Sequence, residues 1–132
     1  MSTSNFELVT GAQTATGQGS GKLITTNSMG VVDVNITAAS GTLVFDLWLE
    51  GSNDNGVTWF ELFHNGAMKT SGLAAENAPS AAGRPIIDNK TTTTLEKFCA
   101  IYPWLACKYI RAAWTLSGTT PSVTFTARFG GK

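Results

Sequence analysis

The sequence predicts an all-β protein, an antiparallel β-sandwich of jelly-roll-like form with one long loop. Apolar and polar residues alternate with a period of two wherever the sequence is regular, as expected of strands that bury one face. No long window has the 3.6-residue period of an amphipathic helix, and β-branched residues and glycine occur throughout. Turn-forming clusters divide the chain into about seven or eight strands, the number typical of a sandwich or jelly roll.

Four segments alternate most clearly. Residues 42–50 place four apolar side chains on one face, namely Leu43, Phe45, Leu47 and Leu49. Residues 30–37, 108–116 and 122–129 show the same pattern, and each of these strands needs a second layer to cover its apolar face. Weaker patterns add four further candidate strands: residues 6–10, 22–26, 57–63 and 92–101.

Two turn clusters predict how the strands connect. Residues 51–56 (GSNDNG) tolerate positive φ and form local side-chain turns, so residues 43–50 and 57–63 should form a hairpin. Residues 117–121 (SGTTP) should likewise turn the two C-terminal strands back on each other.

The length predicts one domain that spans residues 1–132. Residues 1–10 are expected to be an N-terminal arm or an edge strand, and residues 11–21 a flexible linker or a wide turn. Residues 65–90 have little periodicity and are predicted to be a long loop, which in a compact domain usually carries function. We therefore expect contacts with a partner on residues 1–10 and 65–90.

The charge balance excludes several classes of partner. Nine basic and nine acidic side chains cancel, and charged residues make up only 14% of the chain. Without a net positive field, we expect neither nucleic acid nor a membrane as a partner. Residues 1–9 lack the basic and apolar regions of an export signal, and no segment is long enough to span a membrane.

Cys99 and Cys107 are the only cysteines. Two cysteines are too few for the disulfide framework of a small secreted domain, and no CxxC pair indicates zinc or redox chemistry. The sequence favours two small buried thiols in a reducing compartment, and a disulfide between Cys99 and Cys107 is the alternative.

The chain has few candidate catalytic groups, so we predict that it is not an enzyme and has no cofactor or metal. His64 is the only histidine, and no hydrolase, metalloprotease or phosphate-loop motif occurs. His64 follows the predicted hairpin and is expected to be an ordinary residue at a loop edge. The loop around Asp54 lacks the spaced carboxylates and final Glu of an EF-hand, so a turn explains it better than calcium binding.

Aromatic residues are the main candidates for contacts with a partner. Trp114 falls on an apolar face and is predicted to be core, whereas Trp48 and Trp59 fall on the polar face of the predicted hairpin. That face could stack sugars, contact another protein or be covered by residues 65–90. The candidate interface residues are Phe6, Trp48, Trp59, Phe63, Leu73 and Trp104.

Arg111 lies in the middle of a predicted strand, where an unpaired guanidinium would be costly to bury. Its candidate partners are three carboxylates on other predicted strands: Asp33, Asp46 and Glu96. A structural ion pair and an anion-binding role are both open.

Three segments carry a resemblance to a known family: residues 49–59 (LEGSNDNGVTW), 109–114 (YIRAAW) and 116–125 (LSGTTPSVTF). They are similar to segments of the small β-sandwich virion proteins of tailed bacteriophages, which often act as capsid decoration or cement proteins. The resemblance covers roughly the middle and the C-terminal half of the chain. It implies a jelly roll or related sandwich, a homotrimer, and binding to the major capsid protein on the outer capsid surface. It also implies assembly in the host cytoplasm and no catalytic residues.

The expected function is therefore that of a bacteriophage capsid decoration protein, which binds the outer shell and stabilises it by bridging capsomers. Two alternatives stay open. The first is a tail, neck or head-fibre component of the same virion, and the second is a carbohydrate-binding module that stacks sugars on Trp48 and Trp59. An enzyme is the least favoured class, because His64 is the only histidine.

Overall fold

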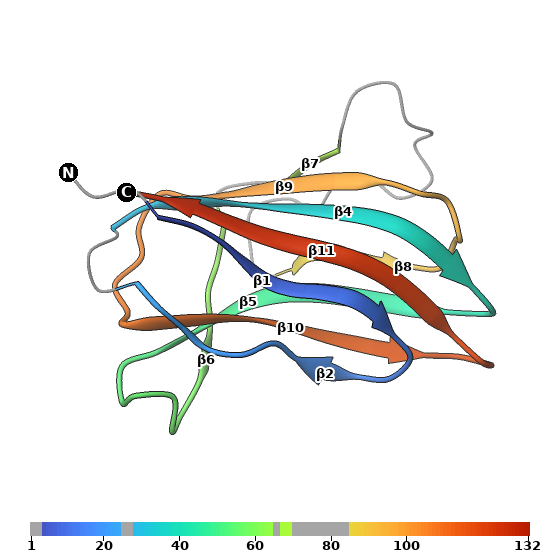
Figure 1. Cartoon of the computed structure of the whole chain (residues 1–132), viewed down its shortest axis with the longest axis horizontal. Coiled ribbons are helices and arrows are strands. Elements are labelled where there is room, and N and C mark those ends of the chain that lie inside the picture. The colour runs from blue at the N-terminus through green and yellow to red at the C-terminus, as the bar shows by residue number, and fades with distance from the viewer. Residues whose placement is uncertain (1–3, 25–27, 65–66, 70–84) are drawn as a thin grey trace.

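The structure is a computed structural model that describes residues 4–24, 28–64, 67–69 and 85–132. These residues form two antiparallel sheets that face each other, and they contain no helix (Figure 1). The predicted all-β antiparallel sandwich is therefore confirmed. It follows that the described ranges include no helix able to cross a membrane.

The first sheet has five strands in the order β1-β11-β4-β9-β7. Their bounds are Ser4–Gln13 for β1, Ser122–Gly131 for β11, Gly30–Ser40 for β4, Lys97–Tyr102 for β9 and Ala67–Lys69 for β7. The second sheet has six strands, with β2-β10-β5-β6 as neighbours, β3 beside β10 and β8 beside β5. Their bounds are Gly17–Gln18 for β2, Tyr109–Ser117 for β10, Val44–Ser52 for β5, Phe60–Glu61 for β6, Lys22–Leu23 for β3 and Pro85–Lys90 for β8.

Most strands of the first half of the chain pair, in reverse order, with strands of the second half. β1 pairs with β11, β2 and β3 pair with β10, β4 pairs with β9, and β5 pairs with β6 and β8. Contacts between β11 and β4 and between β10 and β5 then join these pairs into the two sheets. The start of β1 therefore lies beside the end of β11 (Figure 1).

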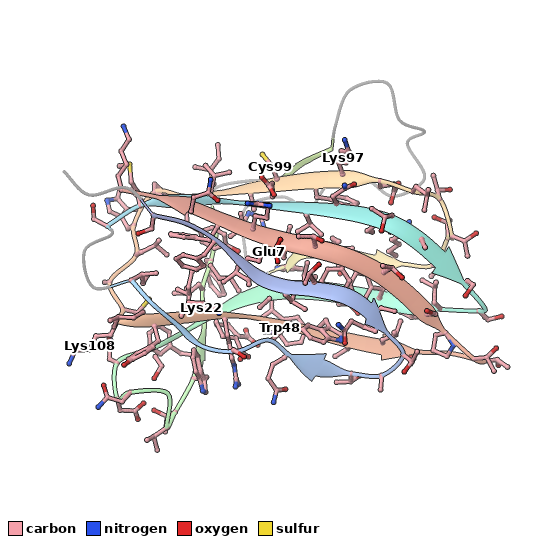
Figure 2. All side chains as sticks on the ribbon, in the orientation of Figure 1. Glu7, Lys22, Trp48, Lys97, Cys99 and Lys108 are labelled. Carbon is pink, nitrogen blue, oxygen red and sulfur yellow. The ribbon has the colours of Figure 1, made fainter. Side chains whose placement is uncertain are left out.

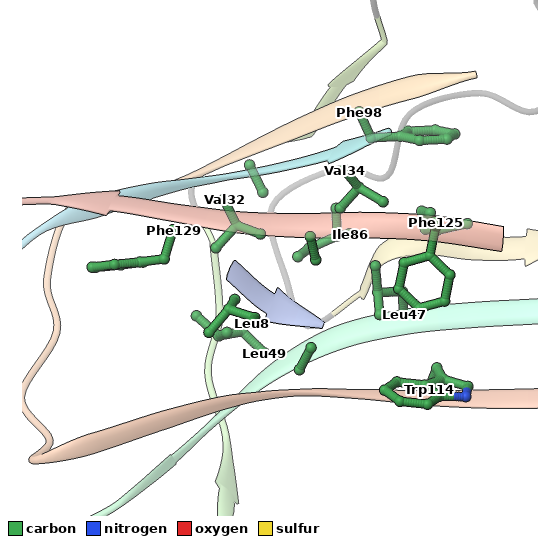
Figure 3. Packing of buried hydrophobic residues seen from close by; sticks show 14 of the residues in the cluster. Leu8, Val32, Val34, Leu47, Leu49, Ile86, Phe98, Trp114, Phe125 and Phe129 are labelled. Atoms are coloured by element: carbon green, nitrogen blue, oxygen red, sulfur yellow. The ribbon is translucent and has the colours of Figure 1, made fainter. Parts of the chain in front are cut away.

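The predicted inward faces of the four clearest strands are confirmed. Alternate residues of β4, β5, β10 and β11 are buried, and they supply most of the core (Figure 3). Phe125 lies between the sheets, with its ring 5.3 Å from that of Phe45 and 5.6 Å from that of Trp114. Trp114 is buried, as predicted, and each large side chain buried in this way contributes about 1.5–3 kcal/mol.

The two C-terminal strands do not turn back on each other, contrary to the prediction for residues 117–121. β10 belongs to the second sheet and β11 to the first, so this segment crosses between the sheets. Residues 41–43 cross in the same place between β4 and β5, and Thr42 N donates a hydrogen bond to Thr119 O over 3.2 Å. A Cβ at Gly118, where φ is +125°, would lie 1.9 Å from Thr42 O, so glycine is required there.

The prediction of a long loop over residues 65–90 is wrong at residues 67–69, which form strand β7 beside β9, and at residues 85–90, whereas residues 65–66 and 70–84 lie outside the described residues. Residues 85–90 are strand β8, which buries Ile86 and Ile87 and pairs with β5. Because β8 occupies much of this edge of β5, the hairpin predicted for residues 57–63 is reduced to the short strand β6.

Two other boundaries differ from the predictions. β1 is an edge strand, as one alternative proposed, and it extends to Gln13, into the predicted linker. The next residues are held by the second sheet, because Trp114 Nε1 donates a hydrogen bond to Ala15 O over 2.9 Å. The strand predicted for residues 92–101 begins only at Lys97, because Lys90 binds groups of the preceding segment.

Candidate functional site

Polar side chains of β5 and β10 meet on the outer face of the second sheet, where the register places Arg111 opposite Glu50. Arg111 Nε donates a hydrogen bond to Glu50 Oε1 over 2.8 Å, and Trp48 Nε1 donates one to Glu50 Oε2 over 3.0 Å. Both charged side chains are mostly covered. Glu50 therefore joins β5 to β10 through its bond with Arg111, while its second carboxylate oxygen accepts a hydrogen bond from Trp48 on its own strand.

None of the three carboxylates predicted for Arg111 is its partner. Asp33 lies on β4 in the other sheet, and Glu96 pairs with a lysine. Asp46 faces the same way as Glu50 but accepts a hydrogen bond from Thr115 Oγ1 over 3.1 Å. The prediction was wrong because alternation identifies the face on which a side chain lies and not its neighbour on the next strand.

Trp59 is held against Arg111. The guanidinium carbon of Arg111 lies 4.2 Å from the centroid of the Trp59 ring, within the range of a cation–π contact. The indole Nε1 donates a hydrogen bond to Gly56 O over 3.1 Å, and a Cβ at Gly21 would lie only 2.9 Å from the ring. Much of the Trp59 ring is therefore in contact with this chain, and Trp59 is half-buried.

Lys90 and Glu96 form an ion pair that the sequence analysis missed. Lys90 Nζ lies 2.7 Å from Glu96 Oε2, and both side chains are 0% exposed. The same ammonium group donates to Thr92 Oγ1 over 3.1 Å and to Thr94 O over 2.9 Å. All three donors of the lysine are used, which ties residues 91–96 to the core and indicates a structural role.

His64 was predicted to be an ordinary residue at a loop edge. It is instead buried, with 3% of its surface exposed. Its Nε2 lies 2.5 Å from Pro85 O, and its ring meets Tyr102 edge-on with centroids 5.9 Å apart. Burial also raises the pKa of Tyr102 far above its ordinary value, so this phenol stays neutral. His64 packs between β8 and β9 and offers no exposed imidazole for catalysis.

Asp54 organises the loop between β5 and β6. Its carboxylate accepts hydrogen bonds from Thr58 Oγ1, from Thr58 N over 2.8 Å and from Ser52 Oγ over 2.8 Å. These bonds, that of the Thr58 side chain first, hold the pKa of Asp54 at about 2, below its ordinary 3.8. Within the described ranges, no three His, Cys, Asp or Glu side chains are grouped to hold a metal ion.

The two cysteines are separate free thiols, so the alternative of a disulfide between them is not seen. Cys107 is buried as expected, and burial raises the pKa of its thiol. Cys99 is only half-buried, because it lies on the outer face of β9 (Figure 2). The expectation of burial is therefore correct for Cys107 and wrong for Cys99.

The structure divides the candidate interface residues into two groups. Phe6 packs on Phe129, with ring centroids 5.3 Å apart, and like Trp48 and Trp59 it is half-buried in contacts with its own chain. Phe63 and Trp104 are 68% and 83% exposed. Leu73 lies outside the described residues.

A groove with a volume of about 560 Å³ lies at the end of the first sheet, and the sequence analysis did not find it. Asn5, Gly130, Val31 and Ile101 are successive cross-strand neighbours in its lining. A Cβ at Gly130 would have no atom within 4 Å. This row of four cross-strand neighbours therefore has a gap at Gly130, beside the exposed side chains of Val31 and Ile101. The available signal was Val31, an apolar residue on the face that also carries Asp33.

Comparisons with protein families, with curated proteins and with solved structures find no match to this chain.

Proposed function

We propose that this chain is a virion structural protein, a bacteriophage capsid decoration or cement protein that binds the outer capsid shell and stabilises it. The proposal starts from the resemblance of residues 49–59, 109–114 and 116–125 to phage virion proteins. One observation carries it further: Glu50 and Trp59 from the first segment both contact Arg111 from the second. The shared residues thus form a contact that holds two strands and a loop together, as expected of a structural motif.

The order of the strands supports a jelly roll as the form of this sandwich. The reverse-order pairing of early with late strands, with two crossings between the sheets at one end, is the arrangement of a rolled-up hairpin. Jelly rolls are common in viral capsid proteins. Fold alone does not assign a function, so this feature adds weight only together with the resemblance.

The rival of a carbohydrate-binding module is less well supported. A sugar-stacking platform needs an aromatic face that is open to the ligand. The Arg111 guanidinium occupies a face of Trp59, and Trp48 is half-buried and bonded to Glu50. The proposal that the chain binds and assembles without catalysis, cofactor or metal stays a prediction.

The proposed partners are further copies of this chain in a homotrimer and the major capsid protein. The protein would be made in the host cytoplasm and would reside on the outer capsid surface. Its balanced charge and the Thr-, Ser- and Gly-rich composition suit close packing among many copies. We propose neither nucleic acid nor a membrane as a partner.

Cryo-electron microscopy of particles from the parent phage and from a strain in which this chain is deleted tests the proposal. We expect sandwich-shaped density on the outer shell of the parent only, and rupture of the deletion particles at a lower temperature. Density at the tail, neck or a head fibre would instead assign the first alternative. A monomer that binds glycans and is missing from particles would assign the carbohydrate-binding module.

A further inference from the structure

Exposed apolar side chains are concentrated at one end of the sandwich. This end, here called the groove end, comprises residues 22–24, 28–31, 53–59, 101–108 and 130–132, and it lies at the left of Figure 1. Nine large apolar side chains of the described residues are exposed, and six of them belong to the groove end: Leu23, Met29, Val31, Val57, Ile101 and Trp104. Such a concentration is typical of a surface that another molecule covers.

The groove and Trp104 together supply the features of an interface core. The groove has room for a large side chain beside Val31 and Ile101, and Pro103 links its lining to Trp104. Trp104 is 83% exposed, and an aromatic side chain buried in a complex removes about 150–250 Å² from water. Tryptophan is among the residue types that most often dominate the binding energy of a protein interface, and Trp104 lies next to a concave apolar site.

Charge at the groove end indicates what covers it. Its described segments contain three lysines, Lys22, Lys108 and Lys132, and the first two are labelled in Figure 2. They contain only one acidic residue, Asp54, whose carboxylate is already bonded within its own loop. A second copy docked end to end would bring lysines against lysines, which opposes self-association there. A protein surface with carboxylates around a protruding apolar side chain is complementary in both charge and shape.

The opposite end of the sandwich has a different character. It comprises residues 14–16, 41–43, 91–95 and 117–121, which are mostly threonine, with serine and glycine, and contain no charged side chain. Leu95 is the one large apolar side chain exposed in these segments. This threonine-rich end therefore has neither the group of exposed apolar side chains nor the lysines of the groove end.

We propose that the groove end is the surface by which this chain docks on the capsid shell, with the threonine-rich end facing outward. The shell contributes an apolar side chain to the groove and carboxylates to the lysines around it. This inference rests on the proposed function, and it adds the orientation of the molecule and the chemistry of the contact.

Cosedimentation with empty shells from the deletion strain measures the contact. The protein is added as the unaltered chain, as Trp104→Ala, as Gly130→Gln, which places a side chain in the groove, and as the matched control Leu95→Ala. We expect Trp104→Ala and Gly130→Gln to weaken binding about tenfold or more and Leu95→Ala to leave it unchanged. Added salt should weaken binding of the unaltered chain, because the lysines are at the rim.

Each other outcome overturns a defined statement. If the unaltered chain binds shells and both groove-end variants bind equally well, the docking surface is wrong and the proposed function stands. If the unaltered chain does not bind shells, the proposed function fails and the inference with it. Binding to anionic lipid vesicles that both variants abolish, without binding to shells, would assign the groove end to a membrane. Where Trp104→Ala lowers the melting temperature, Gly130→Gln alone decides.

Discussion

Lys90 and Glu96 form a 2.7 Å ion pair in which neither side chain reaches solvent. The pair and the bonds from Lys90 to Thr92 and Thr94 close residues 91–96 against β8, and β9 begins directly after them. Transfer of both charges from water to the protein interior costs free energy, and the attraction between the two charges offsets this cost.

Removing one charge of this pair should lower the free energy of unfolding far more than replacing both residues with apolar ones. Glu96→Gln should lower the free energy of unfolding by about 3–5 kcal/mol, because the lysine loses its countercharge in a dry site. The double variant Lys90→Met, Glu96→Leu should lose much less than the sum of the two single changes. Urea denaturation of the unaltered chain, Glu96→Gln, the single variants Lys90→Met and Glu96→Leu, and the double variant measures these differences. Additive losses in the cycle would show that the two charges do not depend on each other.

The contact between Arg111 and Trp59 should appear as a coupling energy. In a double-mutant cycle of Trp59→Ala and Arg111→Met, we expect about 0.5–1 kcal/mol of coupling, the range of a partly exposed cation–π contact. A parallel cycle of Val57→Ala with Arg111→Met is the control, because Val57 is in the same loop and highly exposed. Equal coupling energies in both cycles would mean that Arg111 stabilises the whole loop and has no specific contact energy with the Trp59 ring.

Gly118 should not tolerate a side chain. Gly118→Ala combines a positive φ with a Cβ at 1.9 Å from Thr42 O, so the two crossings must separate. We expect a loss of about 2–3 kcal/mol or more, measured as a fall in melting temperature. Gly130→Ala is the matched control, because its Cβ would meet no atom within 4 Å, and it should change stability by less than about 0.5 kcal/mol. A stable Gly118→Ala protein would contradict the packing of residues 41–43 against residues 117–121.

The loop at Asp54 should make stability depend on pH in the acid range. The pKa of Asp54 is about 2 in the folded chain against an ordinary 3.8, so the carboxylate favours the folded state above the higher value. As the pH falls toward the lower value, that contribution is lost. The difference in melting temperature between the unaltered chain and Asp54→Asn should therefore be constant near neutral pH and shrink between pH 3.8 and about 2. Asp88→Asn is the control, because it removes an exposed carboxylate from β8. Its melting temperatures show how much of the pH dependence arises from the loss of any one carboxylate.

The two cysteines should differ in reactivity. Cys99 is half-buried on an outer face, whereas Cys107 is buried and its raised pKa leaves less thiolate at a given pH. Iodoacetamide should modify Cys99 first in the folded protein and both residues once urea is added, as mass spectrometry of the peptides will show. Fast modification of Cys107 without denaturant would mean that the region between β9 and β10 opens.

Much of the interior followed from the sequence. Val32, Val34 and Ile36 alternate with polar residues in one strand, as do Leu43, Phe45, Leu47 and Leu49 in another, and all seven are buried. Period-two alternation suffices for this result, because successive side chains of a strand point to opposite faces and only one face is apolar.

The neighbours of each strand were decided by the tertiary structure. Arg111 and Glu50 are 61 positions apart in the sequence, and only the register of β10 on β5 places them together. The segment at residues 117–121 has the composition of any tight turn, but β10 and β11 lie in different sheets. Local composition is the same for a hairpin and for a crossing, so the packing of the two sheets determines which one forms.

The groove end shows the same division between local pattern and tertiary arrangement. The sequence by itself determined that Val31 is an apolar residue on a polar face and that Trp104 lies outside the regular strands. Only the folded chain brought Gly130 between Asn5 and Val31, and the loop of Trp104 beside them. A groove forms from the gap between side chains of different strands, and strand neighbours are set by long-range pairing that no local pattern contains.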